Sequence, residues 1–263
     1  VLQKMGELNA ARQQFESEVA IRQGLLLRNP KQMLWREELA TSHSFLAGVL
    51  EDLGEQEAAL EHRRADVRTY TELCSFDASN AQWRRNQAIG RHRLGKLLSE
   101  TGSLGDGLAE LNNAEQLLEP IVAVETTRRT WRDDLASIKA TDAELLAQSG
   151  NRRAARAKVE EAVRLLGTPK ERGAKQRLAF ALLVKGSIDA ADGRKAAARE
   201  SWQQARDVLQ PASQWREPRQ IAVMARVLMA LGDRAEAAAL VGRLRAIGYG
   251  NREFMSLSRT EGY

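Results

Sequence analysis

Apolar residues recur at helical spacing along most of the chain. Between positions 35 and 53 a mainly apolar stripe steps forward by three or four residues and consists of Trp35, Leu39, Ser42, Leu46, Val49 and Leu53. This spacing predicts one helix that ends before Gly54, because glycine accepts the left-handed conformation that closes a helix. A second helix is predicted over about residues 55–73, and the polar segment FDASNAQ then supplies a turn and an N-cap for the next helix.

The same pattern returns at a fixed interval. Trp35, Trp83 and Trp131, each followed by arginine, are 48 residues apart. Glycines at turn-like positions stand at Gly6, Gly54, Gly102, Gly150, Gly193 and Gly232. Five positions after each of these lies a small residue, namely Ala11, Ala59, Gly107, Ala155, Ala198 and Ala237. A period of this length indicates an array of about six helical hairpins, in which small residues let neighbouring helices approach closely.

Composition supports an all-α protein. Only five prolines interrupt 263 residues, and good helix formers dominate. No apolar run reaches the length of about 18 residues that a membrane-spanning helix needs, so we expect no membrane segment. Cys74 is the single cysteine, which excludes an internal disulfide and is compatible with a reducing, cytoplasmic compartment.

Three segments resemble the tetratricopeptide repeat: HSFLAGVLEDLGEQEAALEHRRA, HRLGKLLSETGSLGDGLAELNNA and FALLVKGSIDAADGRKAAARESWQQA. They share a leucine–glycine or small pair in the first helix, the turn glycine, and the small residue five positions later. The resemblance implies a right-handed α-solenoid of about six hairpins, the first one incomplete. It assigns residues 1–247 to the repeat array and 248–263 to a C-terminal cap or tail. The 48-residue interval exceeds the usual period of the family and looks like the lengthened repeats of large bacterial signalling proteins.

The tryptophans and the chain ends allow two further expectations. Each tryptophan heads the apolar stripe of a first helix, so we interpret it as a core residue, with the following arginine in solvent, rather than as a ligand-stacking platform. Val1 lies only five residues before Gly6, so the first repeat lacks most of its first helix. A solenoid needs a covered or polar end, and we therefore expect further sequence upstream, including a domain of the same chain as a partner.

The sequence shows no pattern of catalysis, metal binding or cofactor binding. His43, His62 and His92 lack a second ligand at the spacing of known zinc sites. The run GSLGDG is glycine-rich, but it occupies the position of an inter-helix turn and lacks the lysine of a P-loop. Cys74 has no partner motif and is expected to be a small core residue. We therefore expect a non-enzymatic protein without a cofactor.

Charge is unevenly distributed along the chain. Residues 1–150 hold 18 Lys and Arg against 23 Asp and Glu, whereas residues 151–263 hold 22 against 12. A solvated helix face is the simplest explanation of the basic stretch from Arg152 to Arg177. An acidic partner, whether protein or nucleic acid, is the other. Nucleic acid is less favoured because Phe180 is the only aromatic residue close to these cations.

We therefore predict a scaffold for protein or peptide recognition, within a larger bacterial regulatory or signalling protein. By the resemblance, first helices line the concave groove, and its polar candidates are His92, Lys96, Glu144, Arg219 and Arg226. Because this groove becomes basic toward its C-terminal end, a ligand that spans it should be acidic. A nucleic-acid- or nucleotide-sensing solenoid that uses the basic C-terminal half is the alternative, and an enzyme with a hidden active site has no supporting residues.

Overall fold

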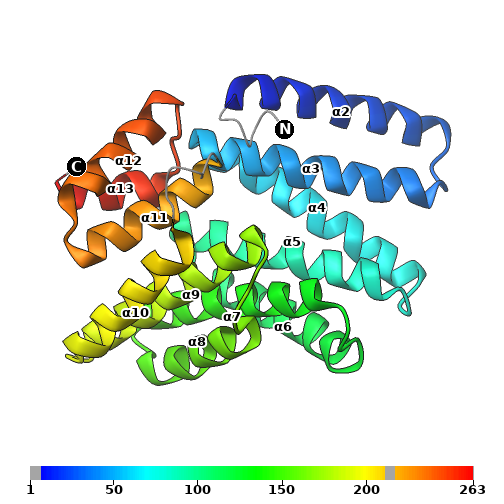
Figure 1. Cartoon of the computed structure of the whole chain (residues 1–263). Coiled ribbons are helices and arrows are strands. Elements are labelled where there is room, and N and C mark those ends of the chain that lie inside the picture. Colours follow the sequence, from blue (N-terminus) through cyan, green and yellow to red (C-terminus); the bar gives the residue numbers. More distant parts are fainter. Residues whose placement is uncertain (1–6, 211–216, 263) are drawn as a thin grey trace. The chain divides into compact units, whose positions relative to one another are not determined.

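A computed structural model of the chain describes residues 7–210 and 217–262. Over these residues the secondary structure is entirely helical, without a strand (Figure 1). The helices are α2 (Leu8–Arg28), α3 (Met33–Leu53), α4 (Gln56–Phe76), α5 (Ala81–Glu100), α6 (Leu104–Val124), α7 (Arg129–Gln148), α8 (Arg152–Leu166), α9 (Arg172–Ala191), α10 (Lys195–Leu209), α11 (Pro218–Leu231), α12 (Arg234–Ala246) and α13 (Arg252–Thr260). The expected all-α class is confirmed. None of the helices described is long and apolar enough to cross a membrane.

The chain forms two compact units. Unit 1 comprises Val1–Ile121 and Ile247–Arg252, and unit 2 comprises Val122–Ala246 and Glu253–Tyr263. A first helix is one that precedes a turn glycine (α3, α5, α7, α9, α11), and a second helix is one that comes after it (α4, α6, α8, α10, α12). Each unit is therefore built from successive hairpins of one first and one second helix.

The turn glycines end the first helices as the sequence predicts. Gly54 follows the last residue of α3 with φ of 84°, a left-handed conformation that only glycine adopts without strain. The amide of Glu55 donates to the carbonyl of Leu50 at 2.8 Å, which satisfies one of the free carbonyls at the helix end. Gly102, Gly150, Gly193 and Gly232 also have positive φ, and Gly6 lies outside the described residues.

The small residues after the turns lie where two helices pack closely: within one hairpin for the later repeats, and on α2, which packs against α3, for Ala11. Ala59 is fully buried, and Ala11, Ala155, Ala198 and Ala237 are at most 1% exposed. At the corresponding place in the next hairpin two glycines face each other, and a Cβ on Gly107 would lie 2.7 Å from the carbonyl oxygen of Gly95. The prediction of close helix packing at these positions is confirmed.

The three repeated tryptophans differ in burial. Trp131 is buried with 4% exposed, whereas Trp35 and Trp83 are half-buried. Trp83 packs beside Tyr70 and Leu73, and its indole Nε1 donates to Glu37 at 3.0 Å. The interpretation as core residues therefore holds for Trp131 and in part for the other two.

The arginine after the first tryptophan, Arg36, is partly exposed to solvent, with 32% of its side chain accessible, and it also forms specific contacts. Its guanidinium donates to the carbonyl of Pro30 at 2.9 Å and pairs with Glu72 at 2.9 Å. The arginine thus ties the start of α3 to the preceding turn and to the end of α4, since Pro30 and Glu72 lie there.

A segment near the C-terminal end belongs to unit 1. The amide of Gly250 donates to the carbonyl of Asp52 at 2.7 Å, and Arg252 donates to Gln56 at 3.3 Å. The two backbones approach so closely that a Cβ on Gly250 would lie 2.6 Å from the carbonyl oxygen of Leu53. Residues 247–252 therefore cover the turn between α3 and α4, and only glycine fits at the point of contact.

Candidate functional site

The structure brings two of the predicted groove residues together in unit 2. Glu144 lies on α7 and Arg226 on α11, and their side chains form an ion pair with Nη2 and Oε1 2.6 Å apart. The same guanidinium lies 3.5 Å from Glu253 and 5.8 Å above the ring centre of Phe180. Arg226 is thus held by two carboxylates and an aromatic ring of its own unit.

This arrangement changes what the two residues can do. A groove residue that only contacts a ligand could be exchanged for glutamate with little effect on stability. Arg226 cannot be exchanged in this way without loss of stability, because a glutamate there would face the carboxylates of Glu144 and Glu253. Arg226 therefore stabilises unit 2, and a ligand would meet a charge that is already neutralised.

The other three predicted residues lie elsewhere. Lys96 on α5 forms an ion pair with Glu100 at 3.1 Å, one helical turn away. His92 is half-buried on the same helix of unit 1, and Arg219 is half-buried in the first turn of α11 in unit 2. None of these three lines either of the two grooves described below.

Unit 2 contains a groove of about 450 Å³ between its first helices α7, α9 and α11. Its apolar surface comes from Ala147, Val184, Ile188 and Ala191, and its polar rim includes Glu144, Gln148, Arg152, Ser187 and Arg226. This volume and this mixture of an apolar surface with a few polar groups are typical of ligand-binding clefts. Because first helices line it, this groove corresponds to the surface that the resemblance assigned to ligands.

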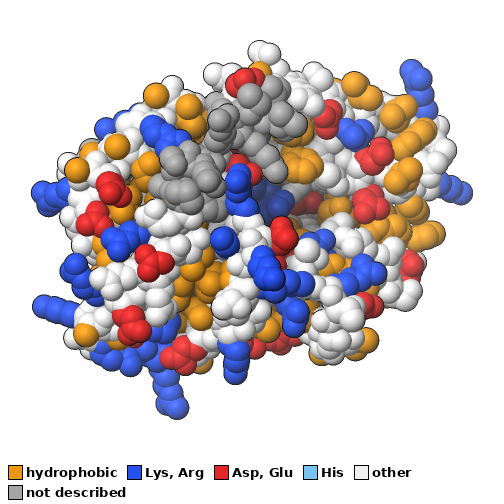
Figure 2. Space-filling model, viewed as in Figure 1, with side chains coloured by type: hydrophobic (Ala, Val, Ile, Leu, Met, Phe, Trp, Pro, Cys, Tyr) orange, Lys and Arg blue, Asp and Glu red, His pale blue; other side chains and the backbone are white. Residues whose placement is uncertain are grey.

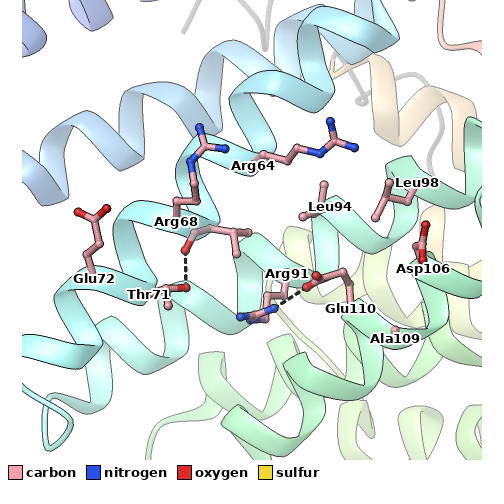
Figure 3. Close-up of a pocket in the computed structure, with 11 residues that line it drawn as sticks. Arg64, Arg68, Thr71, Glu72, Arg91, Leu94, Leu98, Asp106, Ala109 and Glu110 are labelled. Carbon is pink, nitrogen blue, oxygen red and sulfur yellow. Dashed lines mark hydrogen bonds and ion pairs between the residues drawn. The ribbon is translucent and has the colours of Figure 1, made fainter.

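Unit 1 contains a groove of about 630 Å³ that sequence reasoning missed (Figure 3). It lies between the second helices α4 and α6, with α5 between them. Helix α5 contributes Arg91, Leu94 and Leu98, which share one face, whereas His92 and Lys96 lie on a different face of that helix. The one available sequence signal was the pair Arg64 and Arg68, which are spaced one helical turn apart.

The basic stretch of unit 2 is partly neutralised by acidic residues of the same unit. Buried Asp189, 1% exposed, lies 2.7 Å from Arg156, 2.7 Å from Arg194 and 3.2 Å from Lys185. Other basic residues of the stretch have acidic partners too: Lys158 pairs with Asp142, and Arg177 with Asp134. Lys and Arg side chains over α8 and α10 are accordingly interspersed with acidic ones (Figure 2). Fewer positive charges of this stretch are therefore available to a ligand than its net charge suggests.

Two histidines form a pair in unit 1 that the sequence spacing did not reveal. The Nδ1 atoms of His43 and His62 are 2.8 Å apart, so one ring donates and the other accepts. Burial, together with the neighbouring His62 and Arg68, lowers the pKa of His43 to about 4. The described residues contain no group of three His, Cys, Asp or Glu side chains that could hold a metal ion.

We expect the His43–His62 pair to weaken unit 1 in mild acid. A histidine whose pKa is lowered by folding binds protons more readily when unfolded. Its destabilising effect is therefore absent above about pH 6.5 and grows as the pH falls toward 4. Urea unfolding of the native protein and a His43→Leu variant at pH 7.5 and pH 5 measures the effect. Between pH 7.5 and pH 5, the unfolding free energy of the native protein should fall by about 1 to 2 kcal/mol relative to that of the variant.

Comparing the native protein with His43→Leu also removes the effect of Asp66, which changes stability with pH in the opposite direction. Burial raises the pKa of Asp66 to about 6, so this carboxyl adds stability as the pH falls from 6 toward 3.8. Both proteins contain Asp66, and its effect cancels in their difference. A difference in unfolding free energy that stays constant between pH 7.5 and pH 5 would contradict the assignment to His43.

The chain is similar to several solved structures in its fold. No protein-family model matches the chain, and no curated protein matches it. Among solved structures, BtubC (BKLC) from P. vanneervenii is similar with a TM-score of 0.52, at 17% identity over 97% of this chain and 93% of that one. PilF of Pseudomonas aeruginosa, at 16% identity over 97% and 99% of the two chains, gives a TM-score of 0.43. A tetratricopeptide repeat protein from Parabacteroides merdae, at 13% identity over 99% and 100%, gives 0.37.

These likenesses concern the fold, since the identities are low. Helical hairpins with a glycine turn, a small residue five positions later and close packing at that residue are present in both units. One of these neighbours, the protein from Parabacteroides merdae, is described as a tetratricopeptide repeat protein. The chain is accordingly an all-α array of tetratricopeptide-like helical repeats.

Proposed function

We propose that the protein is a non-catalytic scaffold that binds a protein or peptide segment in the groove between α7, α9 and α11 of unit 2. The observation that carries this proposal is the groove itself, about 450 Å³ with an apolar surface and a polar rim. Tetratricopeptide-like folds of this kind suggest protein interaction in general terms. The placement of the predicted residues Glu144 and Arg226 on the groove rim supports it further.

The ion pair between Glu144 and Arg226 determines which part of the groove a segment would use. Because the two charges satisfy each other at 2.6 Å, the remaining contacts are the apolar surface, the uncharged Gln148 and Ser187, and Arg152, which pairs with Asp192 at 3.6 Å. Ser187 is exposed on α9, and its hydroxyl donates to the carbonyl of Leu183 within the same helix. Apolar side chains of a ligand would therefore lie mainly against Ala147 and Ala191, because Val184 and Ile188 at the base of the groove are only 3% and 2% exposed.

Nucleic acid is a weaker candidate for the partner. Arg156, Lys158 and Arg177 are neutralised by acidic residues of unit 2, which reduces the support that the basic stretch gave it. A place in a larger bacterial regulatory or signalling protein, a cytoplasmic location and an upstream domain as partner remain predictions. So does the lack of enzymatic activity.

A groove-filling substitution tests the proposal. A phage-displayed peptide library is selected on the purified native chain, and the enriched peptides are titrated against Ser187→Trp and Ser187→Ala. We expect Ser187→Trp, which fills the groove from an exposed position, to weaken binding about tenfold or more. Ser187→Ala should bind like the native chain. Equal binding to Ser187→Trp, or no enriched peptide at low salt, would refute the proposal.

A further inference from the structure

The groove of unit 1 has two walls of different charge and an apolar floor. Helix α4 contributes Arg64, Val67 and Arg68, and helix α6 contributes Asp106 from its first turn. Between them, Leu94 and Leu98 of α5 lie at the floor. Figure 3 shows the two arginines extending from α4, and Arg91 joined to Glu110. This groove is formed by second helices and is separate from the groove between first helices in unit 2.

Several charges at the groove already have partners within unit 1. Arg91 pairs with Glu110 at 2.7 Å, and Glu72 pairs with Arg36 at 2.9 Å. Among the residues that the structure describes, Arg64, Arg68 and Asp106 have no ion pair within 4 Å. Two cations on one wall and one anion on the other thus remain available to a ligand.

The spacing of the two cations restricts what they can recognise. Arg64 and Arg68 are four residues apart on α4, so they lie on the same face of the helix, one turn apart. Both side chains are exposed, whereas the neighbouring Arg63 is buried and forms an ion pair with Glu51. An arginine guanidinium binds a carboxylate through two parallel hydrogen bonds, so this pair fits two carboxylates at a similar spacing.

The floor distinguishes between classes of acidic ligand. Val67, Leu94 and Leu98 offer aliphatic surface, and no aromatic side chain lines the groove for base stacking. The carboxylate of Asp106, which has no ion pair among the described residues, would repel a phosphate backbone. A protein segment satisfies both conditions, because it combines acidic, apolar and basic side chains.

We propose that the groove between α4 and α6 binds an acidic segment of a protein partner. Two carboxylates of the segment meet Arg64 and Arg68, an apolar side chain lies on Leu94 and Leu98, and a basic side chain meets Asp106. This surface acts independently of the unit 2 groove. Its binding is salt-sensitive because the charges are exposed.

The experiment uses a set of fluorescein-labelled peptides and the full chain. Each peptide carries paired glutamates, leucines and one lysine, and the spacing between these residues varies across the set. Binding is followed by fluorescence polarisation at low and moderate salt. The test variant is Arg64→Gln/Arg68→Gln. The control is Lys195→Gln/Arg199→Gln, which removes two exposed charges at the same spacing on α10 of unit 2.

We expect at least one peptide to bind the native chain, and the test variant to weaken it by about tenfold or more at low salt. The control variant and Ser187→Trp should bind as the native chain does, which separates this proposal from the one for unit 2. An Arg64→Glu/Arg68→Glu protein should prefer a peptide in which the glutamates are replaced by lysines.

Three results would overturn the proposal. The first is that no peptide of the set binds at low salt. The second is that the test and control variants lose the same affinity, which would indicate non-specific attraction. The third is that a single-stranded oligonucleotide, but no peptide, binds in a way that depends on Arg64 and Arg68, which would assign the groove to nucleic acid.

Discussion

Replacing Arg63 with methionine should lower the free energy of unfolding by about 3 kcal/mol, because it removes one member of a buried ion pair. The Arg63 side chain is 1% exposed, and its Nε donates to Glu51 at 2.6 Å. Its Nη1 also donates to the carbonyl of Ser44 at 2.9 Å. Methionine fills a similar volume, so the loss reports the polar contacts rather than a cavity.

The adjacent residue provides the control for this prediction. Arg64→Met alters an exposed side chain on the same helix and should change stability by less than about 0.5 kcal/mol. Urea denaturation of the two variants and the native chain, followed by circular dichroism, measures both changes. If Arg63→Met proves as stable as Arg64→Met, the buried network around Glu51 contributes nothing to the fold.

Trp131→Ala should destabilise unit 2 by about 3 to 5 kcal/mol, as large-to-small changes in a core do. The indole is 4% exposed in the first turn of α7, and the guanidinium of Arg128 lies 4.6 Å from the ring centre. Removing it leaves a cavity and also ends this cation–π contact. Hydrogen exchange should show faster opening of α7 and α8, which pack together as one hairpin.

The equivalent residue in the preceding repeat allows a comparison within the same protein. Trp83 is half-buried, so Trp83→Ala should cost about half as much as Trp131→Ala. Equal losses for the two variants would show that burial does not determine the contribution of the repeated tryptophans. A variant that keeps its stability and loses a specific ligand would instead favour ligand stacking.

Local sequence determined the features that were predicted well. Gly54 and Gly232 end their helices because no other residue adopts φ of 84° without strain, and this requirement is visible in the sequence. Ala59 had to be small because α3 and α4 pack closely beside it. Both features depend on residues a few positions away, so periodicity alone could reveal them.

Contacts between distant residues set the limits of the prediction. Glu144 and Arg226 are 82 positions apart, and only the stacking of α7, α9 and α11 brings them into one ion pair. Arg63 and Arg64 are adjacent in a polar run, yet one is buried and the other exposed. The rotational orientation of α4 about its axis determines which of the two side chains is buried, and sequence spacing does not determine that orientation. The unit 1 groove was missed for the same reason.

The hydrogen bond between Gly250 and Asp52 has a consequence for the order of folding. The two residues are almost two hundred positions apart, yet they belong to the same unit. During synthesis from the N-terminal end, α2 to α6 emerge long before residues 247–252, so the turn after α3 stays uncovered until those residues have been made. Such a distant contact raises the mean sequence separation between contacting residues of unit 1, and it should slow the last folding step of this unit. Ribosome-bound chains that end before Gly250 would then hold a unit 1 that is folded but easier to unfold than in chains that include residues 247–252.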